Sequence, residues 1–161
     1  MVAFLYRMPS GIAGDVSRKE QSVVETQMFN SAASFSAYGL VGKMSAGKFV
    51  PFAGGEAATD AYGVLVRPFP TNAGTDGLGT ATPPTSGPAD VLRRGYITVK
   101  LNGGASVVAG GQVYVRVAAA AAGKPIGGFE GAADSTNTVA INAVFESAAD
   151  ADGNVEISFR N

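Results

Sequence analysis

The segment GKMSAGKF, from Gly42 to Phe49, holds the residue types with the most specific potential chemistry in this sequence. A nucleotide-binding P-loop reads G-x-x-x-x-G-K followed by Ser or Thr, whose hydroxyl holds Mg²⁺. Here Phe49 stands in place of that hydroxyl. The strand-like FVPF then follows, where a helix N-terminus should meet the phosphates. We therefore interpret this segment as a glycine-rich β-turn and not as a nucleotide site.

A second candidate for chemistry is DADGNVE, from Asp150 to Glu156, where carboxylates alternate before a glycine as they do in calcium loops. The EF-hand loop requires a third ligand before its glycine and a glutamate six residues after it. In this sequence the glycine follows the second aspartate, and Glu156 comes only three residues later. We predict a hairpin turn with Asp152 and Gly153 at its tip.

The chain contains no cysteine and no histidine. This excludes disulfides, thiolate zinc sites and every mechanism that needs an imidazole base. Asp, Glu, Ser, Lys and Tyr remain as potential catalysts, but no acidic pair is marked by its context. We predict no enzyme activity, no catalytic residue, no cofactor and no metal site. A small hydrolase is the alternative in the enzyme class.

The composition limits the classes of molecule that the protein is expected to bind. Twelve basic and thirteen acidic residues give a net charge of −1, which argues against the broad basic surface of a nucleic-acid binder. No stretch approaches the ~20 apolar residues of a membrane span, so we expect no membrane partner. The N-terminal VAFLY is short and is stopped by Arg7, so we expect no secretory signal. Residues 90–125 hold five Lys or Arg and one Asp, whereas residues 126–161 hold six acids and one Arg. This asymmetry indicates either a solvated tail or a contact surface of opposed signs.

The pattern of apolar residues predicts a single all-β domain over residues 36–161, as a small β-barrel or a sandwich with Greek-key or meander connections. A sequence of 161 residues with 46% apolar composition can form one such core. The strongest strand signal is GYITVKL, which places Ile97, Val99 and Leu101 on one face. NGGA and SAADADG predict turns, the first with a preferred hairpin pair. Residues 71–90 form a long Gly/Thr/Pro loop. The segments expected to be strands are YGLVGKM, KFVPFAG, YGVLVRPF, GYITVKL, QVYVRVA, VAINAVFE and NVEISFR.

Residues 1–35 form an N-terminal arm without a sustained apolar period. Ser17 and Glu20 fit a capping box that could begin a short helix, but the Val and Thr residues that follow favour an extended arm equally. Ordering ~25 residues costs on the order of 25 kcal/mol in backbone entropy, which needs roughly 1,000 Å² of apolar burial to offset it. The arm must therefore dock on its own domain, on a second copy or on another protein.

Taken in order along nearly the whole chain, several segments resemble the structural cement (capsid decoration) proteins of tailed bacteriophages. The segments that carry the resemblance are GDVSRKEQSVVETQMF, YGVLVRPFPT, RRGYITVKLNGG, GGQVYVRVAAAAAGKPIGGFE and GNVEISF. The resemblance implies a non-enzymatic virion protein that is assembled in the host cytoplasm and sits on the outer surface of the capsid. Such proteins are often trimers and clamp neighbouring major capsid subunits.

From this resemblance we expect the arm and the 71–90 loop to carry the contacts with the major capsid protein or between copies. The candidate contact residues are Phe4, Tyr6, Arg7, Met8, Arg18, Phe29, Leu78, Arg93 and Arg94. Two other classes stay open: another virion component, such as a tail-tube or spike subunit, and a β-sandwich carbohydrate-binding module. The module would need an aromatic platform, and the sequence has no Trp and five Tyr.

Overall fold

The computed structural model describes residues 11–68, 81–104 and 106–160. In this part of the chain the regular elements are nine β-strands and four short 3₁₀ turns, and no α-helix is present. The all-β prediction is therefore confirmed. The strands are β1 (Val23–Met28), β2 (Val41–Ser45), β3 (Lys48–Pro51), β4 (Gly63–Leu65), β5 (Pro88–Lys100), β6 (Gln112–Arg116), β7 (Phe129–Glu130), β8 (Thr138–Phe145) and β9 (Asn154–Arg160). The 3₁₀ turns are η1 (Lys19–Gln21), η2 (Ala58–Asp60), η3 (Asn102–Gly104) and η4 (Ser135–Asn137).

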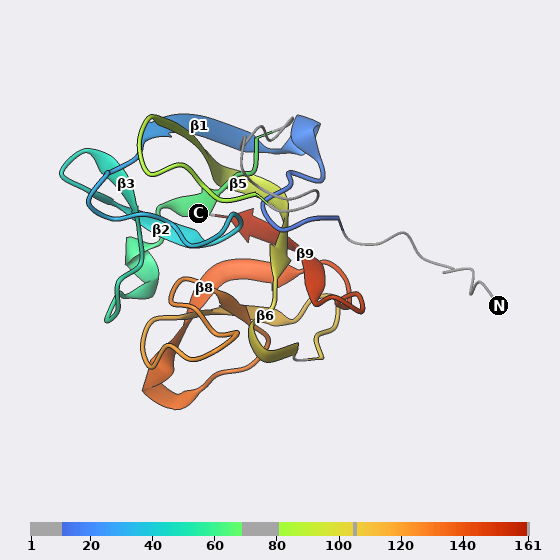
Figure 1. Ribbon diagram of the computed structural model, residues 1–161. Coiled ribbons are helices and arrows are strands. Elements are labelled where there is room, and N and C mark those ends of the chain that lie inside the picture. Colours follow the sequence, from blue (N-terminus) through green and yellow to red (C-terminus); the bar gives the residue numbers. More distant parts are fainter. Residues whose placement is uncertain (1–10, 69–80, 105, 161) are drawn as a thin grey trace.

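Eight strands form one curled antiparallel sheet in the order β3-β2-β4-β5-β9-β8-β6-β7, which has the shape of a half-barrel (Figure 1). Strand β1 is the ninth and pairs with β5. Isolated bridges also join Phe29 to Phe49 and Leu101 to Phe129. The sequence predicted a barrel or a sandwich, and the structure shows a curled sheet without a continuous ladder around its circumference.

Strand β5 pairs with three other strands. Its first half pairs with β1 and with β4, and its second half pairs with β9 from Arg94 to Lys100. The N-terminal segment also pairs with this second half, since the N–H of Gly14 donates to the carbonyl of Thr98 and the N–H of Thr98 donates to the carbonyl of Asp15. Residues far apart in the sequence therefore meet along one strand.

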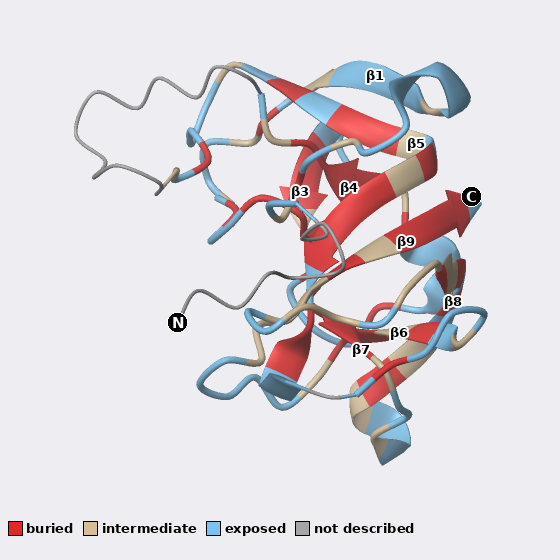
Figure 2. Ribbon diagram, turned by 90° about the vertical axis from the view of Figure 1, so that its right-hand side faces the viewer, coloured by how far each residue is buried: buried red, intermediate tan, exposed pale blue. Residues whose placement is uncertain are grey.

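The apolar residues fill two adjoining clusters. The larger lies under β5, β6, β8 and β9 and includes the fully buried Ile97, Val115 and Ile157. The smaller lies under β2, β3 and β4 and contains the stacked rings of Phe35 and Phe49, with centroids 4.9 Å apart. In Figure 2, β4, β5 and β9 carry many buried residues, whereas β1 is mostly exposed.

The structure decides between the two forms of the arm for the residues that it describes. Only η1 is helical, and β1 continues as an extended strand along β5. The capping box is absent, because the hydroxyl of Ser17 donates to Oε1 of Glu156 instead. The described part of the arm thus joins the sheet at the bridge of Val16 with Ile97 and along β1.

Two further expectations needed correction. The turn at NGGA is present as η3, but it does not join a hairpin, because β5 pairs with β9 and β6 lies beyond β8. Residues 88–90, which the sequence placed in the long loop, begin β5.

The turn at SAADADG does join the paired strands β8 and β9, as predicted. GKMSAGKF forms β2, a two-residue turn and the start of β3, which confirms the β-turn interpretation.

Candidate interaction surface

The outward face of the β5–β9 pair is covered in part by an arginine clamp from the N-terminal segment. The guanidinium of Arg18 lies 4.0 Å above the ring of Tyr96, and its Nη2 is 2.7 Å from Oε2 of Glu156. Burial alone would raise the pKa of Glu156, but the hydrogen bonds from Arg18 and Ser17 hold it below its usual value. This clamp fixes the position of residues 17–22 on the sheet.

Strand β1 lies at an edge of the sheet and is exposed along most of its length. Five large apolar side chains are exposed in the described part of the chain, namely Ile12, Val23, Val24, Met28 and Val108. Four of them fall in residues 12–28, which we call the N-terminal edge. Among the described residues β1 pairs with no strand other than β5, apart from the single bridge at its end. An edge strand with free peptide groups and exposed apolar side chains is a template for pairing with another chain.

A second arginine cluster ties β1 to the sheet. The guanidinium of Arg93 stacks 3.6 Å from the ring centroid of Tyr62 and donates to the carbonyl oxygen of that residue. The hydroxyl of Tyr62 donates to Oε2 of Glu25 on β1 at 2.9 Å, and Nε2 of Gln27 donates to that hydroxyl. Burial raises the pKa of Tyr62, and the hydrogen bond to Glu25 raises it further. The cluster positions β1 on the sheet.

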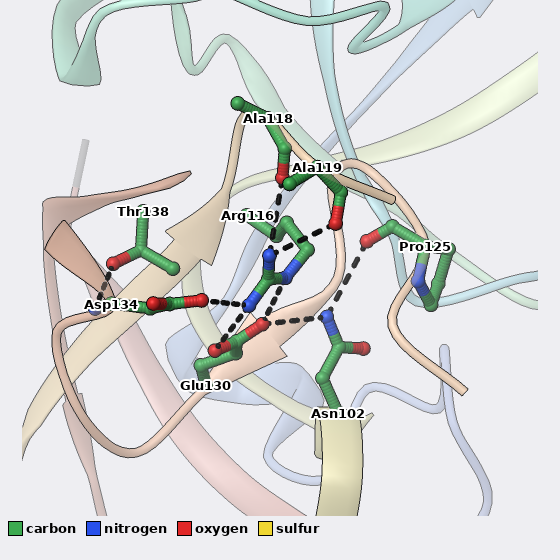
Figure 3. A network of polar contacts seen from close by, with 8 residues as sticks. All are labelled: Asn102, Arg116, Ala118, Ala119, Pro125, Glu130, Asp134 and Thr138. Atoms are coloured by element: carbon green, nitrogen blue, oxygen red, sulfur yellow. Dashed lines mark hydrogen bonds and ion pairs between the residues drawn. The ribbon is translucent and has the colours of Figure 1, made fainter. Parts of the chain in front are cut away.

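A polar network lies between β6, β7 and the segment that leads into β8 (Figure 3). Arg116, only 3% exposed in its side chain, forms ion pairs with Glu130 and with Asp134, the latter at 2.6 Å. Its Nη1 also donates to the carbonyls of Ala118 and Ala119. Nδ2 of Asn102 donates to Glu130, at 3.3 Å, and connects the end of β5 to the network.

The contacts of this network lie within the chain, and they hold β6, β7 and the segment before β8 together. Every buried side-chain N or O atom in the described residues has a hydrogen-bond partner. Within the same residues no three His, Cys, Asp or Glu side chains lie close enough to hold a metal ion. Asp150 uses its Oδ1 to accept the backbone N–H groups of Asp152 and Asn154, which is a turn contact. No helix long and apolar enough to cross a membrane occurs in the described part.

Of the predicted contact residues, the structure describes Arg18, Phe29, Arg93 and Arg94. Phe4, Tyr6, Arg7, Met8 and Leu78 lie outside the described residues.

Among the candidates that the structure describes, Phe29 is 4% exposed and packs on Phe35, so its ring belongs to the smaller core and is not accessible to another chain. Arg18 and Arg93 are neutralised by carboxylates of their own chain. Arg94 is exposed and faces Arg160 across the β5–β9 pairing.

The sequence did not predict that Arg160 lies beside Arg94, because this proximity depends on which strand pairs with β5. The four exposed apolar residues of the N-terminal edge were visible in the sequence as unpatterned apolar residues of the arm. Their exposure depends on the tertiary structure.

All seven described Phe side chains are buried, and no described Tyr is fully exposed. The described surface therefore has no flat aromatic platform of the kind that a carbohydrate-binding module uses.

Comparison with known proteins identifies the family. A family model described as XM1 gp53 minor capsid protein matches residues 1–159. No curated protein matches the chain. A chain of the solved capsid of Myoviridae phage XM1 has a similar fold, with a TM-score of 0.68 and 19% sequence identity over 99% of this chain and 96% of that one. The chain therefore belongs to the XM1 gp53 minor capsid protein family and is a structural protein of a phage virion.

Proposed function

We propose that this protein is a cement protein that binds the outer surface of the assembled head, acts as a trimer and holds neighbouring major capsid subunits together. The observation that carries this proposal is the N-terminal edge, where four of the five exposed large apolar side chains of the described residues lie on or beside an edge strand. Apolar groups exposed together mark an interaction site in an otherwise well-buried protein.

The proposed action follows from mass action. A protein that binds the assembled shell, but not the free subunits, stabilises the shell by its binding free energy. Because the lattice repeats the same site, many contacts of moderate affinity add up. This role needs no catalytic group.

The N-terminal edge suits such a contact for two reasons. Strand β1 offers unpaired peptide groups at its outer edge, so a segment of a capsid subunit could add to the sheet there. Val23, Val24 and Met28 would lose water in the same contact, at roughly 25 cal/mol per Å² of apolar surface. The Arg93 and Arg18 clusters hold this segment in place before binding, which reduces the entropic cost.

The test uses purified heads that lack the protein. The variant Val23→Lys/Val24→Lys places two charges on the N-terminal edge, and Val108→Lys is the control because Val108 is 69% exposed and lies between β5 and β6. We expect the control to sediment with heads as the unmodified protein does and the edge variant to remain in the supernatant. Imaging of the decorated heads should place the protein at a fixed lattice position on the outer surface.

A second test is deletion of residues 2–10, which stops before the pairing of Gly14 and Asp15 with β5 and should leave the sheet folded. We expect this truncation to lose head binding. Unimpaired binding by the edge variant would contradict the role of β1. Formation of rings or fibres by the isolated protein, with no binding to expanded heads, would favour a tail-tube or spike subunit instead.

A further inference from the structure

Two arginines of like charge stand directly opposite each other at one end of the β5–β9 pairing. Arg94 and Arg160 are Cα partners in the register, so their side chains leave the same face of the sheet, and both are exposed. Like charges in this position repel each other and destabilise the pairing. No described carboxylate forms an ion pair with either one, whereas Arg18, Arg93 and Arg116 each have such a partner.

The two arginines border a hollow of about 460 Å³ on the outer surface. Its other polar lining comes from Gln21, Tyr96 and Ser158, and none of its lining residues is acidic. Nε of Arg160 donates to the hydroxyl of Ser158 at 3.2 Å, which holds this guanidinium against the floor of the hollow. The lining thus presents two cations and neutral groups that can donate hydrogen bonds, a combination that suits a carboxylate.

The wall of this hollow is held firmly by its own contacts. Gly95 has a φ of +127°, and a Cβ at this position would lie 2.3 Å from the hydroxyl of Ser22. That hydroxyl accepts the N–H of Tyr96 and donates to the carbonyl of Arg18. Ser22 is therefore closely packed against Gly95, and the exposed Gln21 precedes it in the turn that borders the hollow.

Strand β9 ends at Arg160, and a negative charge lies just before its first residue. The turn that precedes β9 contains Asp152, which is exposed and whose side chain has no ion pair or hydrogen bond among the described residues. Oδ1 of Asp150 accepts the N–H of Asp152 and the N–H of Asn154, so the turn holds a fixed shape with Asp152 at its tip. The neighbouring residues are Ala151 and Gly153, whose small size makes this tip narrow.

We propose that the hollow at Arg94 and Arg160 receives the Asp152 turn of a second copy of this chain. The seven residues of β9 separate the two sites by about 20 Å, so one chain cannot satisfy its own arginines. A contact between different surfaces of identical chains is head-to-tail, and it closes into a ring when the rotation between copies permits. This inference rests on the trimer of the proposed function and names the residues that would join its copies.

The test measures self-association of the full chain without heads, by sedimentation velocity over a range of concentrations. The hollow variant is Arg94→Glu/Arg160→Glu, and the turn variant is Asp152→Lys. We expect each to raise the dissociation constant of assembly at least about tenfold, because each replaces an attraction with a repulsion. The triple variant that combines these changes should recover assembly, since the charges are exchanged and opposite again.

The matched control is Lys48→Glu/Lys124→Glu, which changes the net charge by the same amount at one exposed and one half-buried lysine outside both the hollow and the Asp152 turn. It should assemble as the unmodified protein does. Arg94→Gln/Arg160→Gln is a milder variant, and circular dichroism establishes that each variant is folded. Unchanged assembly of the hollow variants, or failure of the triple variant to recover, would overturn the proposal.

A monomeric unmodified protein would also overturn it. The same samples are then mixed with heads, which separates this proposal from the proposed function. Decoration by a protein that does not self-associate would overturn the Asp152 contact and the trimer but not the binding to heads. Assembly without decoration would overturn the cement role and leave the Asp152 contact standing.

Discussion

Removal of Glu130 from the buried network offers a direct test of what holds the β6–β7 half of the sheet together. In the variant Glu130→Gln the side chain keeps its size and loses its charge. Arg116, with only 3% of its side chain exposed, then keeps Asp134 as its one ionic partner. Loss of one member of a buried ion pair costs about 3–5 kcal/mol, because the remaining charge is left without its compensation.

We expect the lower end of that range, about 3 kcal/mol, because three contacts of Arg116 survive. These are the ion pair with Asp134 at 2.6 Å and the hydrogen bonds to the carbonyls of Ala118 and Ala119. For a domain of this size, a loss of 3 kcal/mol lowers Tm by roughly 6–12 °C. Urea unfolding monitored by circular dichroism measures the free energy, and a thermal scan measures Tm.

The double variant Arg116→Met/Glu130→Leu serves as the comparison for Glu130→Gln. Replacement of both members by apolar residues removes the need to desolvate two charges, so it should destabilise less than Glu130→Gln alone. Asp134, whose side chain is 45% exposed, can return to water. A loss of less than about 1 kcal/mol for Glu130→Gln would refute this reasoning, because it would mean that Arg116 is adequately paired without Glu130.

Three further predictions concern pH, a turn and the smaller core. The pKa values of Glu56 and Glu156 lie below their usual range; burial opposes this shift, but hydrogen bonds from Lys43 to Glu56 and from Arg18 to Glu156 outweigh it. The stability that they contribute is present above the ordinary pKa of about 4.3 and is lost as the pH falls below it, which urea unfolding at a series of pH values measures. Gly95→Ala should cost roughly 1–3 kcal/mol because of its positive φ, and more if Ser22 cannot move; hydrogen exchange at the Tyr96 amide should accelerate. Phe49→Ala should cost about 3–5 kcal/mol in the same unfolding assay, because the Phe49 ring is fully buried.

Each of these has a control within the chain. Glu56→Gln should flatten the acid branch of the pH profile, and an unchanged profile would contradict the role of Glu56. Gly110→Ala is the control for Gly95→Ala. Gly110 also has a positive φ, but a Cβ there would meet no other part of the chain within 4 Å, so this variant measures backbone strain without the contact with Ser22. Met28→Ala, at a side chain that is 52% exposed, should change stability by less than about 0.5 kcal/mol, and a loss equal to that of Phe49→Ala would contradict the assignment of the core.

Local patterns in the sequence were sufficient where burial alternates along a single strand. Ile97, Val99 and Leu101 are buried as predicted, and so are Val113 and Val115. Thr98 lies on the opposite face and is nevertheless fully buried, because residues 14–17 pair with β5 and cover it. A pattern within one strand cannot report a neighbour that is more than 80 positions away.

The glycines of GKMSAGKF illustrate the same division. The sequence alone excluded a phosphate site, because Phe49 replaces the hydroxyl that holds the metal. Only the tertiary structure explains Gly42: a Cβ there would lie 2.5 Å from the ring of Phe49, which packs over this glycine with Phe35. Gly47 has a φ of +73° and forms the turn between β2 and β3.

The sequence by itself determined the fold class, most of the strands and the absence of histidine and cysteine chemistry, because these depend on composition and on periods of a few residues. The tertiary structure decided that β1 is a strand, that β5 pairs with β9 and that Arg94 meets Arg160. These features depend on long-range pairing, whose register is set by the burial of whole strand faces and not by local propensity. The candidate surfaces arise from such pairings, so they became visible only when the chain was folded.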